Sequence, residues 1–279
     1  MDDAQFRQLL DQLGLSWEGF RKVRKGVKKR LRRHIQERGY QSSEAYFEAL
    51  GSNHHLREEC ERLMTVSISR FFRDRYLWRI LENEILPAVI ERKGTVKIWS
   101  AGCACGEEVY SFKILLNLLK DRYGHIPDHE ILATDLNPAY LDRARTGIYP
   151  KSSLKEAPEE WLALYFEHQA RGNLYRVASF LKNNVTWKAH NLLSDPPQTI
   201  FDVIFLRNNL LTYYQDTLKI PALQAVIGRL APGGFLIIGS HEIIPLTVSS
   251  LLPFRGQRYI FERLDDDLDE SPQAAKAGI

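Results

Sequence analysis

Residues 95–108 read TVKIWSAGCACGEE, and this stretch decides the fold. Its first six residues form a β-prone run, and small residues that favour a turn follow at 101–106. A helical pattern then extends from about 107 to 122. A strand, a tight turn and a helix in this order indicate the start of an α/β unit.

The same alternation continues along the chain. Further β-prone runs lie at 130–135, 201–206 and 235–239, and helical patterns begin near Pro138 and span about 217–230. Strands that alternate with helices predict a parallel, doubly wound α/β sheet. Such a sheet binds ligands at the carboxyl ends of its strands.

Three other segments define the domain organisation. Residues 1–66 show only helical patterns and predict a small, basic, all-helical domain. Residues 67–264 are expected to form the α/β domain, with an inserted β-hairpin at about 173–190. Residues 265–279 are acidic and then rich in Ser, Pro, Gln and Ala, which predicts a disordered tail.

The composition limits the class of protein. The chain has 279 residues, which fits one large domain or two unequal ones. Hydrophobic residues make up 44% and charged residues 26%, and no apolar run is long enough for a transmembrane helix. Three cysteines are too few for a disulfide framework, and the acidic N-terminus does not resemble a secretory signal. We therefore expect a cytoplasmic protein that does not insert into membranes.

Charge is unevenly distributed although the net charge is only +3. Residues 21–33 read RKVRKGVKKRLRR, with nine basic residues in thirteen, whereas 262–270 hold six acids and one base. A basic helix of this kind indicates an acidic partner, and a merely solvated helical face is the alternative. Nucleic acid is the less favoured partner because no aromatic residues interrupt the basic stretch.

The glycine turn at 102–106 differs from the common phosphate-binding motifs. It lacks the G-x-G-x-x-G fingerprint, and no Gly-Lys-Ser/Thr follows it. Glu107 and Glu108 would repel a pyrophosphate at the helix N-terminus, but they would suit a ligand with an ammonium group or hydroxyls. In the alternative interpretation, the segment is only a tight turn whose glutamates favour the helix dipole.

Two further signals follow this turn. Asp135 ends the second predicted strand, and a carboxylate there can accept hydrogen bonds from both hydroxyls of a ribose. The alternative is that Asp135 only caps the next helix. Pro232-Gly233-Gly234 precedes an apolar strand, which matches a late strand of a class I methyltransferase.

Taken in order, the motifs resemble the CheR family, the S-adenosylmethionine-dependent methyltransferases of bacterial chemoreceptors. The motifs are Ser69-Arg-Phe-Phe-Arg-Asp74, Ile98 to Glu108 with Tyr110-Ser111, Ala133-Thr-Asp135, Gly147-Ile-Tyr149, Asn191-Leu192 and Phe201 to Asn208. The resemblance covers Met64–Phe261 closely, and the basic N-terminus fits the family's helical domain. It implies a class I methyltransferase fold, S-adenosylmethionine as cofactor with S-adenosylhomocysteine as product, and no metal.

The resemblance also implies roles for individual residues. The catalytic residues would be Arg73 and Tyr213. The methionine end of the donor would lie near Ser67, Ser69 and Arg73. Glu107 would contact the methionine or the ribose end, and the turn that contains Gly102 would pass close to the donor. The ribose would be held by Asp135, and the adenine would be bordered by Asn191 and Leu192. The site beside the sulfonium would be closed by Arg207, Asn208 and Asn209.

The sequence departs from the family pattern at several of these positions. The family's Asn-x-Thr is Ser67-Ile-Ser69 here, and its Ser-Thr in the glycine turn is Ala104-Cys105. After Asn208, either Thr212 replaces the family's tyrosine, or one residue is inserted and Tyr213 takes its place. These changes keep small, polar character, so donor binding is expected to survive.

The resemblance implies transfer of methyl groups to glutamate side chains on the acidic methylation helices of a chemoreceptor, by a monomeric enzyme. A glutamate carboxylate is ionised at neutral pH, so this reaction needs no general base. Two alternatives stay open. One is a catalytically impaired family member that binds the donor or its product as an adaptor. The other is a class I methyltransferase with another acceptor, such as RNA or a small acid.

Overall fold

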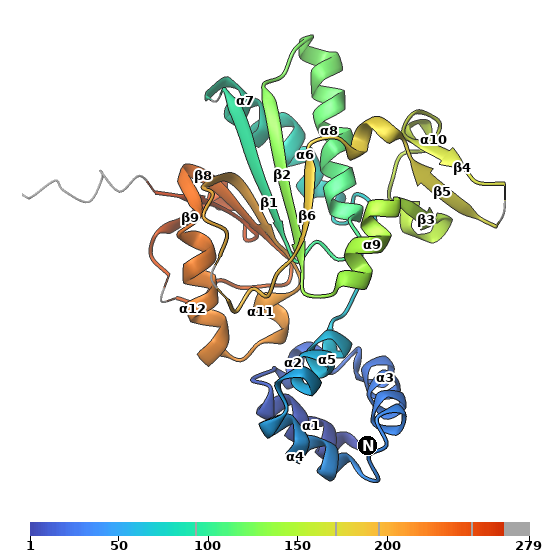
Figure 1. The fold of residues 1–279 in the computed structure, drawn as a ribbon. Coiled ribbons are helices and arrows are strands. Elements are labelled where there is room, and N and C mark those ends of the chain that lie inside the picture. The colour runs from blue at the N-terminus through green and yellow to red at the C-terminus, as the bar shows by residue number, and fades with distance from the viewer. Residues whose placement is uncertain (93, 171, 195, 247, 265–279) are drawn as a thin grey trace, which may run out of the picture.

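The computed structural model describes residues 1–92, 94–170, 172–194, 196–246 and 248–264, and Figure 1 shows their arrangement. A bundle of helices lies below a large sheet covered by helices, and a small second sheet projects to one side. The tail predicted at 265–279 lies outside the described residues.

The large sheet has seven strands in the order β6-β2-β1-β7-β8-β10-β9. The strands are β1 (Thr95–Ala101), β2 (Asp128–Asp135), β6 (Val185–Ala189), β7 (Phe201–Leu206), β8 (Leu230–Ile238), β9 (Leu251–Pro253) and β10 (Ile260–Arg263). β1 pairs in parallel with β2 on one side and β7 on the other, so the chain winds outward in both directions from β1. The expected doubly wound α/β fold of a class I methyltransferase is therefore confirmed, and the crevice beside β1 is where such a sheet binds ligands.

Helices cover both faces of this sheet. They are α6 (Arg75–Ile80), α7 (Leu86–Arg92), α8 (Glu107–Tyr123), α9 (Pro138–Thr146), α11 (Leu210–Tyr213) and α12 (Asp216–Ile227), with a π-helical turn at Leu81–Ile85. Successive side chains of β1 enter opposite cores, since Ile98 packs in the core that contains α8 and Trp99 in the core that contains α12. All six residues of β7 are buried, and five of them are apolar, as expected for a central strand. The exception, Asp202, accepts a hydrogen bond from the Lys97 N–H of β1 at 2.8 Å.

The N-terminal part is helical, as expected. Its helices are α1 (Asp3–Gln12), α2 (Trp17–Phe20), α3 (Arg24–Glu37), α4 (Ser43–Ser52) and α5 (His54–Met64). They enclose a core of their own, to which the basic helix α3 contributes Val27, Leu31 and Ile35, which recur every four residues and so share one helix face. The domain boundary placed at residue 66 stays a prediction.

The hairpin predicted at 173–190 is wrong, although a small inserted sheet exists. β5 (Leu174–Val177) pairs antiparallel with β3 (Ile148–Pro150) and β4 (Phe166–His168), and α10 (Glu159–Tyr165) precedes β4. Residues 185–189 instead form β6, which pairs in parallel with β2 at the edge of the large sheet. The segment between β5 and β6 is a 3-10 helix at Ser179–Lys182, not a hairpin turn. Local sequence could not reveal the true pairing because both partners of β5 precede the predicted hairpin.

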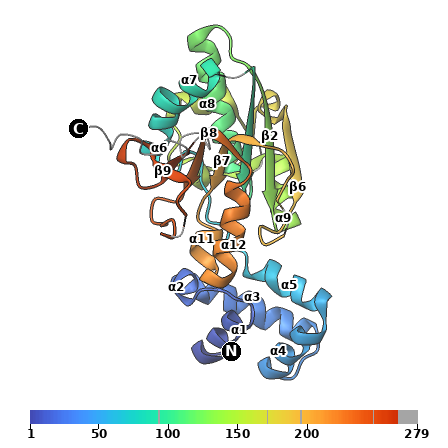
Figure 2. The same cartoon turned by 90° about the vertical axis from the view of Figure 1, so that its left-hand side faces the viewer.

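The helical part meets the α/β part at α11, and Figure 2 shows α11 and α12 directly above α2. Leu15 forms an antiparallel bridge with Tyr214, and the Ser16 N–H donates to the Tyr213 carbonyl at 2.8 Å. The rings of Phe20 and Tyr213 lie 4.8 Å apart. A Cβ on Gly19 would lie 2.2 Å from the Thr212 carbonyl oxygen, so only glycine permits this close contact. We call this contact the α2–α11 seam.

Candidate active site

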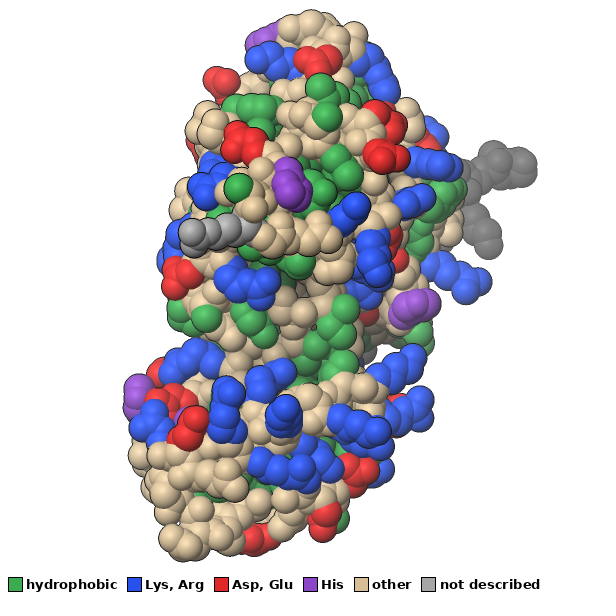
Figure 3. Space-filling view, turned by 90° about the vertical axis from the view of Figure 1, so that its right-hand side faces the viewer, with side chains coloured by type: hydrophobic (Ala, Val, Ile, Leu, Met, Phe, Trp, Pro, Cys, Tyr) green, Lys and Arg blue, Asp and Glu red, His purple; other side chains and the backbone are tan. Residues whose placement is uncertain are grey.

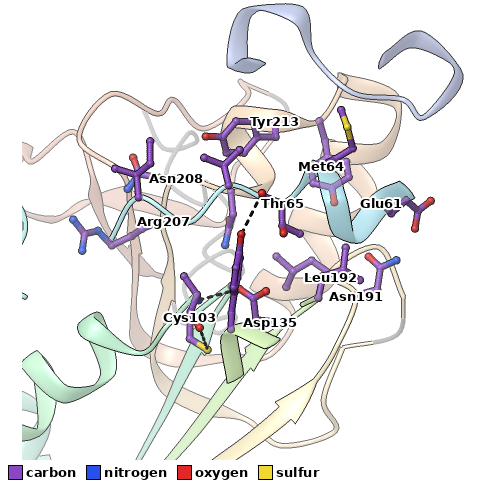
Figure 4. Close-up of a pocket in the computed structure, with 18 of the residues that line it drawn as sticks. Glu61, Met64, Thr65, Cys103, Asp135, Asn191, Leu192, Arg207, Asn208 and Tyr213 are labelled. Atoms are coloured by element: carbon purple, nitrogen blue, oxygen red, sulfur yellow. Dashed lines mark hydrogen bonds between the residues drawn. The ribbon is translucent and has the colours of Figure 1, made fainter. Parts of the chain in front are cut away.

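A cavity of about 270 Å³ lies where β1, β2 and β7 end, between the sheet and the helical part. It is the position that the strand order predicts for a ligand. Ten of the predicted site residues line it: Ser69, Arg73, Gly102, Asp135, Asn191, Leu192, Arg207, Asn208, Asn209 and Tyr213. Ser67 and Glu107 are not part of the lining. Figure 4 shows side chains from distant parts of the chain facing one another across this cavity.

Asp135 lies at the carboxyl end of β2 and is 9% exposed. Its Oδ2 accepts a hydrogen bond from the Ala104 N–H at 2.9 Å, and its Oδ1 accepts one from the Asn137 N–H at 2.8 Å. Burial raises the pKa of Asp135, while these backbone hydrogen bonds act in the opposite direction. Each carboxylate oxygen can still accept a further hydrogen bond, so the group fits a pair of hydroxyls.

The alternative that Asp135 caps the following helix is wrong. The N-cap of α9 is Asn137, whose Oδ1 accepts from the Ala139 N–H at 3.1 Å. Beyond β6, the His190 N–H donates to the Asp135 carbonyl at 3.0 Å. Asn191 fixes the adjoining turn, because its Oδ1 accepts from the Leu193 N–H at 3.0 Å.

Glu107 begins α8 behind the cavity wall and is 4% exposed. Burial raises its pKa, and a hydrogen bond from Ser69, which does line the cavity, opposes that shift. Its Oε2 atom has no hydrogen-bond partner among the described residues. A buried carboxylate oxygen without a donor is costly, so this site suits a ligand that brings an ammonium group. Ser67 lies alongside, with its Oγ 3.5 Å from the Sγ of Cys105.

Gly102 is required by a neighbouring side chain. Its φ is +87°, and a Cβ built there would lie 1.9 Å from the Nδ2 of Asn209. That amide donates to the Ala101 carbonyl at 2.5 Å, and its Oδ1 accepts from the Leu210 N–H at the start of α11. Asn209 therefore connects the end of β1 to α11, and both ends of its amide are used inside the protein.

Arg207 is held by two carboxylates, and the sequence did not predict that either would pair with it. Its guanidinium pairs with Asp74 at 2.6 Å and with Glu108 at 2.9 Å, and its side chain is 5% exposed. Ser100 Oγ also donates to Glu108 at 2.9 Å. Two carboxylates around one guanidinium give the group a net negative charge beside the cavity, which suits a cationic ligand.

Arg73 reaches the cavity from the segment that precedes α6. Its guanidinium donates to the Ile68 carbonyl at 2.8 Å, and its own carbonyl accepts from the indole of Trp78 at 2.9 Å. The preceding Phe71 and Phe72 are buried, and the ring of Phe72 lies 4.9 Å from that of Trp161. These anchors fix the backbone from which the Arg73 side chain extends.

α11 places Tyr213 at the cavity, whereas Thr212 faces Glu242. The Thr212 hydroxyl donates to Oε1 of Glu242 at 2.5 Å. Oε2 of the same carboxylate accepts from the Asn208 N–H at 2.8 Å and from the Gly239 N–H at 2.7 Å. Glu242 thereby joins the ends of β7 and β8 to α11, and it stabilises Asn208 in a backbone conformation with φ of +55°.

Sequence reasoning missed Glu242 and the part of the wall that comes from the helical domain. An acid directly after an apolar strand, in Gly239-Ser-His-Glu242, was a signal of the same kind as Asp135. No local signal marks the helical wall, because its position depends on packing between distant segments. That wall consists of Leu13, Leu15, Phe20, Arg57, Glu61, Met64, Thr65 and Val66.

Two features are absent from the described ranges. Among those residues, no group of three or more His, Cys, Asp and Glu side chains is arranged to hold a metal ion. No helix in the same part of the chain has both the length and the apolar character needed to cross a membrane.

Comparison with known proteins identifies relatives over most of the chain. Residues 67–260 match the family model described as CheR methyltransferase, SAM binding domain. A chemotaxis protein methyltransferase of Listeria innocua is 33% identical over 219 residues, which cover 78% of this chain and 81% of that protein. Chemotaxis protein methyltransferase 1 of Vibrio cholerae is 33% identical over 195 residues, or 69% of this chain and 70% of that protein. The structure of the N-methyltransferase NodS of Bradyrhizobium japonicum is also similar. The match covers 70% of this chain and 100% of the NodS chain, at 14% identity and a TM-score of 0.39.

Proposed function

Because this chain belongs to the CheR methyltransferase family, we propose that it transfers methyl groups from S-adenosylmethionine to glutamate side chains of a chemoreceptor. The observation that carries the proposal is the composition of the cavity. Its lining combines a carboxylate for ribose hydroxyls with an arginine and a tyrosine on the acceptor side, and Glu107, whose buried Oε2 lacks a donor within the described ranges, lies directly behind the wall at Ser69.

The donor-binding residues fit the donor's chemistry. Asp135 would accept hydrogen bonds from the ribose hydroxyls, and Glu107 would pair with the ammonium group of the methionine end. Leu192 and Asn191 would border the adenine. The negative group formed by Arg207 and its two carboxylates would favour a sulfonium over a neutral thioether, and thus substrate over product.

When bound, S-adenosylmethionine supplies a methyl group that a nucleophile can take from sulfur. In the reaction, a glutamate carboxylate oxygen forms a bond to carbon, and the electron pair of the broken carbon–sulfur bond stays on sulfur. No proton moves, so the protein needs no base. Its task is to position the carboxylate in line with the methyl group, and orientation of this kind can lower a barrier by several kcal/mol.

Arg73 and Tyr213 are the two side chains that would orient the acceptor. Both line the cavity, and Arg73 has guanidinium donors beyond the one that contacts Ile68. Burial raises the pKa of Tyr213, so its hydroxyl stays protonated and can donate a hydrogen bond at neutral pH. A guanidinium and a phenol would hold one carboxylate oxygen while the other attacks.

The partner proposed for the helical part is an acidic receptor helix. Figure 3 shows lysine and arginine side chains gathered over this part of the molecule and beside the groove above it. The charges of α3 and the preceding turn are not equivalent. Lys28 pairs with Asp3 at 2.8 Å and is 12% exposed, so it is not available to a partner. The exposed basic residues, which we call the basic face, are Arg21, Lys22, Lys25, Lys29, Arg32 and Arg33.

The proposal is tested by supplying donor labelled in its methyl group to receptor-containing membranes. We expect this protein, the labelled donor and the membranes together to yield radioactive receptor. The receptor should lose its label in mild base, as carboxyl methyl esters do. Label that is stable to base would indicate another acceptor atom. Binding of S-adenosylhomocysteine without any transfer would support a donor-binding adaptor instead and would overturn the proposed activity.

A further inference from the structure

Arg30 lies on the basic helix α3, but its contacts differ from those of its neighbours. Its Nε and Nη2 atoms donate to the Leu63 carbonyl at 3.1 and 2.9 Å, and Nη2 also donates to the Thr65 carbonyl at 2.9 Å. Both carbonyls lie at the carboxyl end of α5. The guanidinium of Arg30 is therefore directed into the protein, whereas neighbouring Lys29 is exposed.

The segment that Arg30 holds is a wall of the candidate active site. Met64, Thr65 and Val66 line the cavity, and Figure 4 shows Met64 and Thr65 on the side opposite Cys103. From the helical part, Arg30 is the described side chain that contacts the carbonyls on both sides of Met64.

The same segment is fastened from the sheet side. The Nδ2 of Asn137 donates to the Thr65 hydroxyl at 3.1 Å, and the Tyr140 hydroxyl donates to the Thr65 carbonyl at 3.4 Å. Asn137 also donates its backbone N–H to Asp135. A short chain of contacts thus connects Arg30 to the carboxylate that would hold the ribose.

The chemistry of the contact requires arginine. The last carbonyls of a helix have no intrahelical partners and carry partial negative charge, so a cation placed there is stabilising. A planar guanidinium presents donors in a fixed fork, and the carbonyls of Leu63 and Thr65 accept from the same Nη2 while Nε also contacts Leu63. A lysine ammonium keeps the charge but cannot reproduce this geometry.

We propose that Arg30 is a positioning residue for the donor pocket, because it fixes the Leu63–Thr65 wall against the sheet. The inference rests on the proposed identity of the cavity as the donor site. It separates two functions within one basic helix: the exposed basic face meets the acidic partner, and Arg30 shapes the donor site. Arg30 itself need not touch the donor.

The test compares Arg30→Met and Arg30→Lys with the matched control Lys29→Met, which removes the adjacent exposed charge. S-adenosylhomocysteine affinity is measured by calorimetry, and donor KM and kcat are measured with receptor. We expect Arg30→Met to weaken S-adenosylhomocysteine binding about tenfold and to raise the donor KM with little change in kcat. The variant loses charged hydrogen bonds to the Leu63 and Thr65 carbonyls, and the wall that they hold then fits the donor less well. Arg30→Lys should recover only part of this loss in affinity, and Lys29→Met should bind S-adenosylhomocysteine with wild-type affinity.

A second variant separates positioning from general loss of stability. Asn137→Ser removes the amide that holds Thr65 but keeps a side-chain oxygen that can cap α9. Because both residues hold one segment, the losses in affinity for Arg30→Met and Asn137→Ser should be less than additive in the double variant. Normal product affinity in Arg30→Met, or complete rescue by lysine, would overturn the inference. Wild-type protein that binds product without methylating receptor would instead contradict the proposed activity and leave the inference about the donor pocket intact.

Discussion

The Asp135 carboxylate is bound by the backbone and also faces the cavity. Its oxygens accept from the backbone N–H groups of Ala104 and Asn137, which join the glycine turn to the start of α9. The remaining acceptor capacity faces the cavity. We therefore expect a substitution at this residue to affect both the shape of the turn and the proposed contacts to the donor.

We expect Asp135→Asn to weaken S-adenosylhomocysteine binding at least tenfold, because an amide presents an N–H group where the carboxylate accepts hydrogen bonds. Calorimetry measures the change. The matched control is Asp142→Asn on α9, which removes an exposed carboxylate. Equal affinity in the Asp135 variant and the wild type would mean that this residue only shapes the turn.

Arg73 is the side chain whose removal should affect transfer most. We expect Arg73→Ala to lower the rate of receptor methylation about 100-fold or more, the loss typical of removing one donor that stabilises charge in a reaction. Arg79→Ala on α6 is the control, because that arginine is exposed and lies outside the cavity lining. Near-normal turnover of a folded Arg73 variant, with folding checked by circular dichroism, would refute the assignment.

At the scale of elements, α11 is a single turn whose position depends on Glu242. The Glu242 carboxylate accepts hydrogen bonds from Asn208, Gly239 and Thr212, so Glu242 joins two strand ends to the helix that carries Tyr213. The element is too short to be stable alone. Its geometry is therefore set by this residue and by the α2–α11 seam.

We expect Glu242→Gln to lower the melting temperature and to reduce kcat more than it reduces donor affinity. The glutamine oxygen can keep the two N–H bonds, but its NH₂ then faces the Thr212 hydroxyl, which must turn from donor to acceptor. The charge that strengthens all three hydrogen bonds is also lost, and hydrogen bonds to charged groups contribute about 1.5–3 kcal/mol. Thr212→Val, which removes one of the three hydrogen bonds, should have a smaller effect in the same direction. Calorimetric unfolding and a donor titration measure both quantities. A variant with wild-type kcat would show that α11 is held by the seam alone.

Elements with a strong local pattern were predictable from the sequence. β1, β2, β7 and β8 appear where β-prone runs were found, because strands buried on both faces need continuous apolar sequence. β5 and β6 were paired wrongly, since strand pairing depends on partners that lie elsewhere in the chain. β6 finds its partner in β2 about fifty residues earlier, and nothing in its own residues specifies this.

In the candidate site too, residues in local motifs were predictable, and contacts between distant segments were not. Residues within recognisable motifs, such as Asp135 and Arg73, were predicted and lie at the cavity. The partners of Arg207 were not, because Asp74 and Glu108 come from segments that only the folded sheet brings together. The Thr212 and Tyr213 alternatives were also open in the sequence, and the orientation of α11 distinguishes them.

At the scale of the whole molecule, the residues of the basic face lie outside the lining of the cavity. We expect the triple reversal Lys25→Glu, Lys29→Glu and Arg32→Glu to slow receptor methylation about tenfold or more at low salt, with unchanged S-adenosylhomocysteine affinity. Exposed charges mainly guide encounter with an oppositely charged partner, and salt screens them. The difference from wild type should therefore shrink as ionic strength rises.

Methylation rates over a salt series measure this effect. The control reverses three exposed charges on the α/β part, Lys120, Lys155 and Arg258, so that net charge changes equally. If both triple variants slow the reaction to the same extent, the effect comes from overall charge. If the basic-face variant methylates at the wild-type rate in low salt, the face is only solvated.

The α2–α11 seam has a consequence for synthesis on the ribosome. Leu15 meets Tyr214, 199 residues later in the chain. At about 5–20 residues per second, roughly 10–40 s separate the emergence of the two partners. During that interval the helical part can fold around its own core, but the apolar side chains that later meet α11, Leu15 and Phe20 among them, stay exposed to other nascent chains. The dense positive charge of α3 gives this early intermediate mutual repulsion, which would keep it dispersed until α11 arrives.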